Sequence, residues 1–372
     1  MVSDMNAIID TEAQLTLRSC IQKVATGPEY SKDLSFDEAR AAMCSILSGN
    51  ADPVQAAVFF IGLRMKRETD AENKGVLQGI IDTMTRVEAP VDELVDVADP
   101  YDGFTHGLPA SPFLPAVLAA CGVPAISHGL EAVGPKFGVT HRKVLRCAGV
   151  NVDLTPTEAA LRLGMPEIGW AYVDQRQFCA PLHDLVGLRQ RIVKRQVLTT
   201  VETLVRPVCG RVKTHLLTGY VHKAYPPVYA ELGRYAGFDS ALIVRGVEGG
   251  VTPTLQQPGK VFYYHDKGAE QFFEVQPEAL GIHQSSRAVP IPKAAAGQDD
   301  TVADTDALAQ LAAEAGLAAL KGQQGPTYDS LVYTGALTLT HLQRYASLQA
   351  AADAVRGILN SGAALAHFQA GR

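Results

Sequence analysis

The sequence predicts an α/β protein in which a small N-terminal helical domain precedes a larger α/β domain with a mostly parallel central sheet. Three observations support this. Helix start signals dominate up to residue 88, short apolar runs alternate with helical stretches after Pro90, and 47% of the 372 residues are apolar while 19% are charged. This composition indicates a folded chain long enough for two domains. We expect residues 1–88 to form the helical domain, joined by part of 181–204, and residues 89–372 to form the α/β domain.

The helices of the first domain are marked by their capping residues. Capping boxes occur at 35–38 (SFDE) and 69–72 (TDAE), and Asp52-Pro53 places a proline in the first turn of a helix. Apolar residues then recur on one face of each segment. Short connections such as 47–50 favour antiparallel packing of neighbouring helices.

Beyond Pro90 the apolar residues form short runs of the length of a β-strand. Helical stretches separate these runs, which lie at 94–98, 123–126, 215–220 and 241–244. The alternation predicts a mostly parallel sheet with helices on both faces. Ligands of such folds bind beyond the carboxyl ends of the strands. We therefore expect the site to lie at 99–107, 127–138 and 245–253.

Composition also predicts where the protein resides. The first ten residues carry two acids and no base, unlike an export signal. The most apolar segment, 112–126, is interrupted by Gly122-Val123-Pro124, whereas a bilayer span needs about 20 apolar residues. Six scattered cysteines without a C-x-x-C pair indicate reduced thiols. We expect a cytoplasmic protein without a membrane partner.

Positive charge is concentrated in one part of the chain. The net charge is −6, yet residues 141–223 carry 13 Lys and Arg against 6 Asp and Glu. Such a segment either follows a phosphate backbone or forms a solvated surface whose cations pair with nearby acids. The candidate anion-binding residues are Arg142, Lys143, Arg146, Arg189, Arg191, Lys194, Arg195, Arg211 and Lys213. Nearby aromatic residues either stack on unpaired bases or pack in the core: Trp170, Tyr172, Phe178, Tyr220 and Tyr225.

Several segments resemble a known family. Residues 34–79, with an S-x-x-E-A box followed by "ILSGNADPVQAAVFFIGLRMKRET", resemble the helical domain of anthranilate phosphoribosyltransferase and related glycosyltransferases. Segments 99–129 and 189–195 and the closing "SGAALAHF" continue the match. The resemblance implies the nucleoside phosphorylase/phosphoribosyltransferase fold. It also implies a homodimer formed through the helical domain, and a cleft between the domains that binds phosphoribosyl pyrophosphate with magnesium.

The two phosphate-binding loops of that family depart from its pattern here. Tyr101, Asp102, Gly103, His106 and Gly107 stand in the loop that replaces G-T-G-G-D-G. The K-H-G-N-R motif becomes "SHGLE" at 127–131, which keeps His128 and Gly129 but places Glu131 at an arginine position. Carboxylates thus stand where phosphates would arrive. The cleft-loop candidates also include Ser111.

The metal and substrate positions of the family change as well. The paired D-E that holds magnesium is reduced to Glu248-Gly249, and an arginine used for the aromatic carboxylate falls at His183. Losing a lysine, an arginine and one carboxylate costs on the order of 5 kcal/mol, roughly a few thousandfold in affinity. We therefore do not expect ordinary phosphoribosyl transfer.

Individual cleft residues keep two interpretations. His106, His128 and His183 either act as a general base or phosphate contact or are structural histidines; His128 and His183 are the catalytic candidates. Glu248 either holds one magnesium weakly or caps a turn, and Lys136 either binds one phosphate or lies in a plain turn.

Three segments are similar to a divergent branch of the family: "YDGFTHGLPASPFLPAVLAACGVPAISHGL", "QFCAPLHDLVGLRQRIVKR" and "ALIVRGVEGGV". Its members keep the fold, pair as homodimers and include proteins that bind nucleic acid with little sequence preference. This implies a homodimer that binds single-stranded DNA or RNA non-specifically through a basic cleft, with no cofactor and no ordinary phosphoribosyl transfer. The alternative is a glycosyl or phosphoribosyl transferase or phosphorylase with an unidentified substrate and magnesium. A metabolite-sensing or scaffold dimer is a third possibility.

Overall fold

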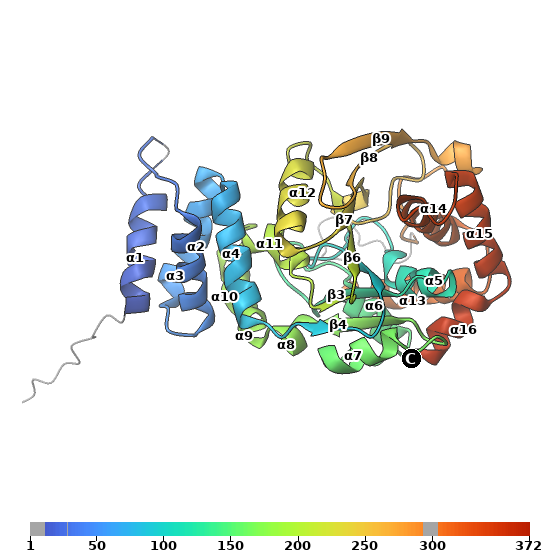
Figure 1. Ribbon diagram of the computed structural model, residues 1–372, viewed down its shortest axis with the longest axis horizontal. Coiled ribbons are helices and arrows are strands. Elements are labelled where there is room, and N and C mark those ends of the chain that lie inside the picture. The colour runs from blue at the N-terminus through green and yellow to red at the C-terminus, as the bar shows by residue number, and fades with distance from the viewer. Residues whose placement is uncertain (1–11, 28, 293–303) are drawn as a thin grey trace, which may run out of the picture.

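The computed structural model describes residues 12–27, 29–292 and 304–372 (Figure 1). Four N-terminal helices form a bundle at one end of the molecule, drawn in blue: α1 (Glu12–Val24), α2 (Phe36–Leu47), α3 (Pro53–Lys66) and α4 (Asp70–Thr83). The capping boxes at 35–38 and 69–72 are confirmed, and the Asp52 side chain accepts hydrogen bonds from the amides of Val54 and Gln55. These side chains satisfy amides that the first turn of each helix leaves unpaired.

Four short helices return to this bundle from the middle of the chain. They are α8 (Gln175–Phe178), α9 (Ala180–Asp184), α10 (Val186–Ile192) and α11 (Leu198–Val201). Helix α10 packs against α3, and α11 packs against α4. Segments from two distant parts of the sequence therefore build the side of the bundle that faces the sheet.

A seven-stranded sheet forms the centre of the second domain, in the order β4-β3-β2-β6-β7-β8-β9. Five strands are parallel: β2 (Glu93–Ala98), β3 (Ala125–Gly129), β4 (Trp170–Asp174), β6 (Lys213–Tyr220) and β7 (Ser240–Arg245). Strands β8 (Gly259–Tyr264) and β9 (Gln271–Val275) are antiparallel. A separate parallel pair joins β1 (Val87–Glu88) to β5 (Val208–Cys209). The predicted fold class, with its mostly parallel sheet, is confirmed.

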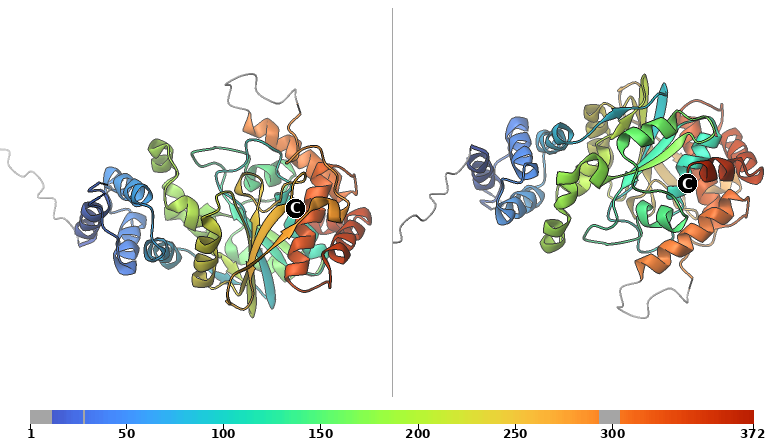
Figure 2. Two further views of the ribbon diagram at one scale, coloured as in Figure 1. Left: turned by 90° about the horizontal axis from the view of Figure 1, so that it is seen from above. Right: turned by 90° about the horizontal axis from the view of Figure 1, so that it is seen from below.

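Helices cover both faces of the sheet. Helix α12 (Tyr225–Ala236) packs on β6, β7 and β8. The other helices of this domain are α5 (Leu114–Ala120), α6 (His141–Cys147), α7 (Pro156–Leu163), α13 (Thr305–Leu320), α14 (Pro326–His341), α15 (Leu348–Asn360) and α16 (Ala363–Ala370). Both views of Figure 2 place the red C-terminal helices at the end of the molecule opposite the blue bundle.

Two apolar cores hold these layers together. One lies between the sheet and the C-terminal helices and contains Phe113, Trp170 and Phe368. The other is continuous from Phe59 in the bundle to Leu216 in the sheet. Because this second core crosses the domain junction, it fixes the bundle against the ends of the strands. No described helix is long and apolar enough to cross a bilayer.

Candidate functional site

The carboxyl ends of the parallel strands meet at the domain junction, where the structure has a cavity of about 270 Å³. Register pairs Ala98 of β2 with Thr218 of β6, and Tyr220 of β6 with Arg245 of β7, so the loops after these strands lie together. Arg64 reaches the cavity from α3 and Arg195 from the segment after α10. We call this space the junction cavity. Its other polar and aromatic lining residues are Asp102, Lys136, Thr199, Thr200, Thr203, Thr218, Tyr220, His222, Tyr225, Tyr229 and Glu248.

The Glu248 carboxylate accepts hydrogen bonds from backbone amides of the loop after β2. Both of its carboxylate oxygens lie 3.0 Å from the Thr105 amide, the Thr105 hydroxyl donates at 3.0 Å, and the His106 amide donates at 2.8 Å. Glu248 has a left-handed backbone, with φ 53°, that turns its side chain toward this loop. Two successive amides are the donors that an incoming phosphate would use. Here an internal carboxylate uses them.

Asp102 neutralises the two nearest cations. Its oxygens lie 3.3 Å from Lys136 Nζ and 2.9 Å from an Arg195 guanidinium nitrogen, although Asp102 itself is only 3% exposed. Lys136 also donates to the Gly103 carbonyl at 2.6 Å. Gly103 has φ 75°, and a Cβ there would lie 2.7 Å from the Gly138 backbone, so this close approach of two loops requires glycine. Lys136 therefore ties the loops together.

The carboxylate of Asp99, which also follows β2, is bonded to groups inside the protein. It contacts the Ser111 hydroxyl, lies 2.7 Å from His141 Nε2, and accepts the Val251 amide at 2.7 Å. The side chains of Asp99, Ser111 and His141 are all buried. Ser111 thus joins the loop after β2 to the interior and does not face the junction cavity.

His128 is held inside the protein by both ring nitrogens. Nε2 lies 2.7 Å from Asp96 Oδ1, and Nδ1 lies 2.5 Å from the Tyr101 hydroxyl. The ring is 1% exposed. Burial raises the pKa of Tyr101 well above its ordinary value. This geometry favours the structural interpretation of His128, because a ligand in the cavity reaches neither nitrogen. Gly129, which follows it, pairs with Asp174 at the strand end.

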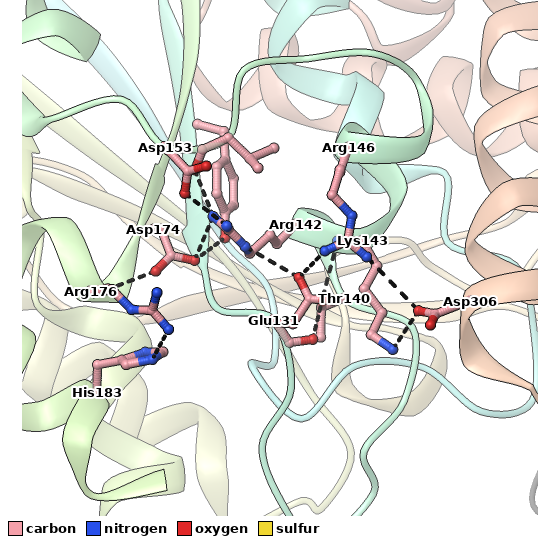
Figure 3. Close-up of polar contacts among 12 residues, drawn as sticks. Glu131, Thr140, Arg142, Lys143, Arg146, Asp153, Asp174, Arg176, His183 and Asp306 are labelled. Carbon is pink, nitrogen blue, oxygen red and sulfur yellow. Dashed lines mark hydrogen bonds and ion pairs between the residues drawn. The ribbon is translucent and has the colours of Figure 1, made fainter.

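Three of the predicted anion-binding residues lie in a network of acids at the start of α6 (Figure 3). Arg142 contacts Glu131, Asp153 and Asp174 at 3.2, 2.7 and 3.1 Å. The other pairs are Arg146 with Glu131 at 2.6 Å and Lys143 with Asp306 at 2.9 Å. These cations are neutralised, as the pairing interpretation expects.

His183 lies at the edge of the same network. Its Nε2 accepts a hydrogen bond from Arg176 at 3.0 Å, which requires a neutral ring (Figure 3). Burial lowers the pKa of His183 and raises that of Asp174. A neutral histidine bonded to an arginine adds no positive charge for a carboxylate or phosphate.

The remaining predicted cations lie in three separate places. Arg189 is fully buried and makes two bonds to Glu202, at 2.6 and 2.5 Å. Arg211 and Lys213 pair with Asp92 and Asp266 at the amino end of β6, whereas the junction cavity lies at its carboxyl end. Of the nine candidates only Arg195 lines the junction cavity, whereas Arg191 lines a separate cavity on the bundle and Lys194 is exposed. The structure does not bring the nine residues into one groove.

The predicted aromatic residues also divide into two groups. Trp170, Tyr172 and Phe178 are buried, and Trp170 stacks on Phe368 with ring centroids 5.2 Å apart. These three belong to the core. Tyr225 lines the junction cavity and is half-buried, and the ring centroid of Tyr229 lies 5.5 Å from its own. Tyr220 touches the cavity too, but it is only 3% exposed and belongs to the second core.

Several residues of the site were not predicted from the sequence. Arg64 at the end of α3 enters the junction cavity, and Arg245 and Arg287 line a neighbouring one. His141 and Asp96 were also missed, and each is one half of a buried pair between a histidine and an aspartate. Position at a strand end was a usable signal for Arg245, but Arg287 lies in an irregular segment without any pattern.

Comparisons with known proteins agree with this architecture. Residues 18–84 match the model of the glycosyl transferase family helical bundle domain, and residues 109–365 match that of the glycosyl transferase family a/b domain. An anthranilate phosphoribosyltransferase of Rhodopseudomonas palustris (strain BisA53) is 28% identical over 95% of this chain and 96% of its own. One of Thermomicrobium roseum is 27% identical over 93% of each.

Solved structures show the same fold. The anthranilate phosphoribosyltransferase of Thermus thermophilus superimposes with a TM-score of 0.69 at 18% identity, covering 95% of this chain and 97% of that one. The Saccharomyces cerevisiae enzyme in complex with PRPP and Mg has a TM-score of 0.75 at 17% identity, covering 95% and 96%. At such identities the match concerns architecture.

Proposed function

The chain belongs to the glycosyl transferase family that has this helical bundle and a/b domain, and from that premise we propose that it is a homodimeric nucleic-acid-binding protein. It binds single-stranded DNA or RNA non-specifically along the junction cavity and the exposed segment 191–195. It does not carry out ordinary phosphoribosyl transfer.

One observation carries this proposal: the junction cavity and the segment beside it combine cations with tyrosines. Arg64, Lys136 and Arg195 line the cavity together with the half-buried Tyr225 and Tyr229. Each of these cations also has an acidic partner, Glu68 at 3.6 Å for Arg64 and Asp102 at 3.3 and 2.9 Å for Lys136 and Arg195. Single-stranded nucleic acid is bound by this combination, because cations follow the phosphates while aromatic rings stack on bases of any sequence.

The segment 191–195 extends the positive surface out of the cavity. Arg191 and Lys194 are exposed, and neither forms an ion pair with any described residue. A phosphate backbone that passes Arg195 in the cavity would continue onto these free charges. In this they differ from the three cations of the cavity and from Arg142 and Arg146, whose charges are already paired with acids.

The hydrogen bonds between Glu248 and the amides of Thr105 and His106 argue against ordinary phosphoribosyl transfer. A pyrophosphate would have to displace the Glu248 carboxylate from the Thr105 and His106 amides. The residues present also do not fit the magnesium site of the family, because both oxygens of Glu248 already accept hydrogen bonds from this loop. Among the described residues, no group of three His, Cys, Asp or Glu is arranged to hold a metal ion.

An apolar hollow on the bundle supports pairing through the helical domain. A cavity of about 630 Å³ is lined by Val54, Val58, Ile61 and Met65 of α3 with Leu188 and Ile192 of α10. Val54 is 70% exposed and Met65 78%. A second copy of the chain would remove this surface from water. Because Arg191 lines the same cavity, segment 191–195 would then lie beside the dimer interface.

Titration of a labelled single-stranded oligonucleotide at several salt concentrations tests the proposal. The logarithm of affinity should fall linearly with that of salt, with a slope of about −0.7 per neutralised phosphate. A double variant, Arg191→Gln with Lys194→Gln, should make this slope shallower by about 1.4. The matched control, Arg211→Gln with Lys213→Gln, removes equal charge at the opposite end of the sheet and should not change it. Absence of binding at low salt would refute the proposal.

The relatives support a second candidate function, a phosphoribosyl or glycosyl transferase or phosphorylase with another substrate. Anthranilate phosphoribosyltransferases match this chain over nearly its full length. Incubation with phosphoribosyl pyrophosphate, magnesium and a panel of aromatic amines and nucleobases tests it. Steady release of pyrophosphate with any of them would favour this candidate.

A further inference from the structure

A second cavity, of about 800 Å³, lies beside the junction cavity and shares Val221 and Glu248 with it. Three segments form its walls: the residues after β7, the stretch 254–258 and the stretch 285–291. His106 of the loop after β2 closes one side. We call this space the arginine cavity, after Arg245 and Arg287.

Hydrogen bonds fix the irregular wall 285–291 in place. The Leu255 amide donates to the Arg287 carbonyl at 3.1 Å, and Gln256 Nε2 donates to the Ser285 carbonyl at 3.1 Å. On the other side, the Leu108 amide donates to the Val289 carbonyl at 3.0 Å. The cavity is therefore built by bonds between segments that lie far apart in the sequence.

The charges on its walls are unbalanced. The side chains of Arg245 and Arg287 are exposed, and no hydrogen bond or ion pair joins either to another described residue. The single carboxylate among the lining residues is Glu248, which is bonded to the loop at 105–106. Two unpaired guanidinium groups in a concave site favour an anion.

The neutral lining groups indicate the kind of anion. Hydroxyls of Thr254, Ser285 and Ser286 and the side-chain amides of Gln256 and Gln257 line the same cavity. Guanidinium forks match the oxygens of a phosphate, and cavities of about 300–1,000 Å³ are typical of small-molecule sites. The lining residues include no Phe, Tyr or Trp, so this part of the described surface supplies no such ring for stacking of bases.

We propose that the arginine cavity binds the phosphate group of a phosphorylated small molecule, with Arg245 and Arg287 as the two cationic contacts. This site does not use the Thr105 and His106 amides, which donate to Glu248. It goes beyond the proposed nucleic-acid binding and does not depend on it.

Calorimetry with ribose 5-phosphate, inorganic phosphate and uncharged ribose tests the proposal. Saturable binding of ribose 5-phosphate at one site per chain is expected, with inorganic phosphate weaker and ribose not bound. Arg245→Gln and Arg287→Gln should each weaken binding of ribose 5-phosphate about tenfold or more, and Arg211→Gln should leave it unchanged. Both arginines are exposed, and thermal melting checks that each variant is folded.

Two outcomes would overturn the proposal. One is the absence of saturable binding to ribose 5-phosphate and inorganic phosphate alike, and the other is binding that neither arginine variant weakens. The same variants are titrated with the oligonucleotide. If Arg245→Gln and Arg287→Gln weaken oligonucleotide binding as strongly as the double variant at 191 and 194 does, and ribose 5-phosphate fails to bind, then the two arginines contact the nucleic acid instead. If the oligonucleotide does not bind but ribose 5-phosphate does, the proposed function fails and the arginine cavity stands.

Discussion

The carboxylate of Glu248 accepts hydrogen bonds from both the amide and the hydroxyl of Thr105, each at 3.0 Å. The two residues lie 143 positions apart in the chain. In a fold whose relatives include a structure with PRPP and Mg bound, a side chain therefore holds donors suited to a phosphate. A ligand must compete with an anion that is already attached to the protein.

Glu248→Gln should destabilise the protein, because a charge-assisted set of bonds becomes a neutral one. We expect the free energy of unfolding to fall by about 1–3 kcal/mol. Urea denaturation measures this. Glu274→Gln, on the exposed edge strand β9, is the control and should change it by less than about 0.5 kcal/mol. Equal effects of the two substitutions would contradict the assigned role.

Arg189→Met should be far more destabilising than any change to the exposed basic segment. Arg189 and Glu202 are almost fully buried, so removing the guanidinium leaves an uncompensated charge in the interior. A loss of about 3–5 kcal/mol is expected from urea denaturation. Arg191→Gln serves as the control, with a change within about 0.5 kcal/mol. A small loss for Arg189→Met would mean that Glu202 finds other partners.

Stability should decline as the pH falls below about 6.5. Burial lowers the pKa of His341 to about 3, next to His265 and His215, whose pKa values burial also lowers. His341 Nε2 bonds Ser240, and its ring stacks on His265 with centroids 4.4 Å apart. The other charged groups around this cluster are Glu93, Lys213, Asp239, Asp266 and Arg344.

Stability falls toward acidic pH because the pKa of His341 is lowered in the folded state. The unfolded chain binds a proton near pH 6.5 while folded His341 does not, so stability is complete above that pH and is lost as the pH falls toward 3. Each such group contributes a slope of at most about 1.4 kcal/mol per pH unit. His341→Gln should flatten the profile measured by urea denaturation from pH 7 to 4, and the exposed His283→Gln should not. A profile that His341→Gln leaves unchanged would contradict this account.

Charge placed in the apolar hollow of the bundle should prevent pairing of two chains. Val58→Glu and Met65→Glu both lie on α3 and line that hollow. We expect the wild type to have the mass of a dimer by light scattering and both variants that of a monomer, because a buried carboxylate without a partner is costly. Leu161→Glu, on the exposed side of α7, is the control and should remain dimeric. Monomeric wild type would exclude the proposed dimer.

Local signals predicted the elements well, and tertiary contacts decided the site. Capping boxes and apolar runs depend on neighbours in sequence, so helices α2 to α4 and the parallel strands β2, β3, β6 and β7 followed from them, whereas the parallel strand β4 was not predicted. Whether a cation is free depends on which acid the fold brings to it. Arg142 meets Asp174 from another strand, while Arg189 meets Glu202 in the core. Clustering in the sequence could not distinguish these from Arg191.

The bonding of Glu248 to the loop after β2 was predicted from the sequence only in part. Position at a strand end identified Glu248 and the loop at 99–107 separately, and the expected carboxylates in the cleft included Asp102 and Glu131. That Glu248 bonds to Thr105 depends on the left-handed turn after β7, which no sequence pattern announced. Arg287 was missed because it lies in an irregular segment, away from every predicted strand end.

Calorimetric titration of the wild type with phosphoribosyl pyrophosphate and magnesium measures whether Glu248 and Asp102 have left the junction unable to hold a pyrophosphate. We expect no saturable binding at micromolar concentrations of the donor. Saturable binding with micromolar affinity and a requirement for magnesium would contradict this expectation.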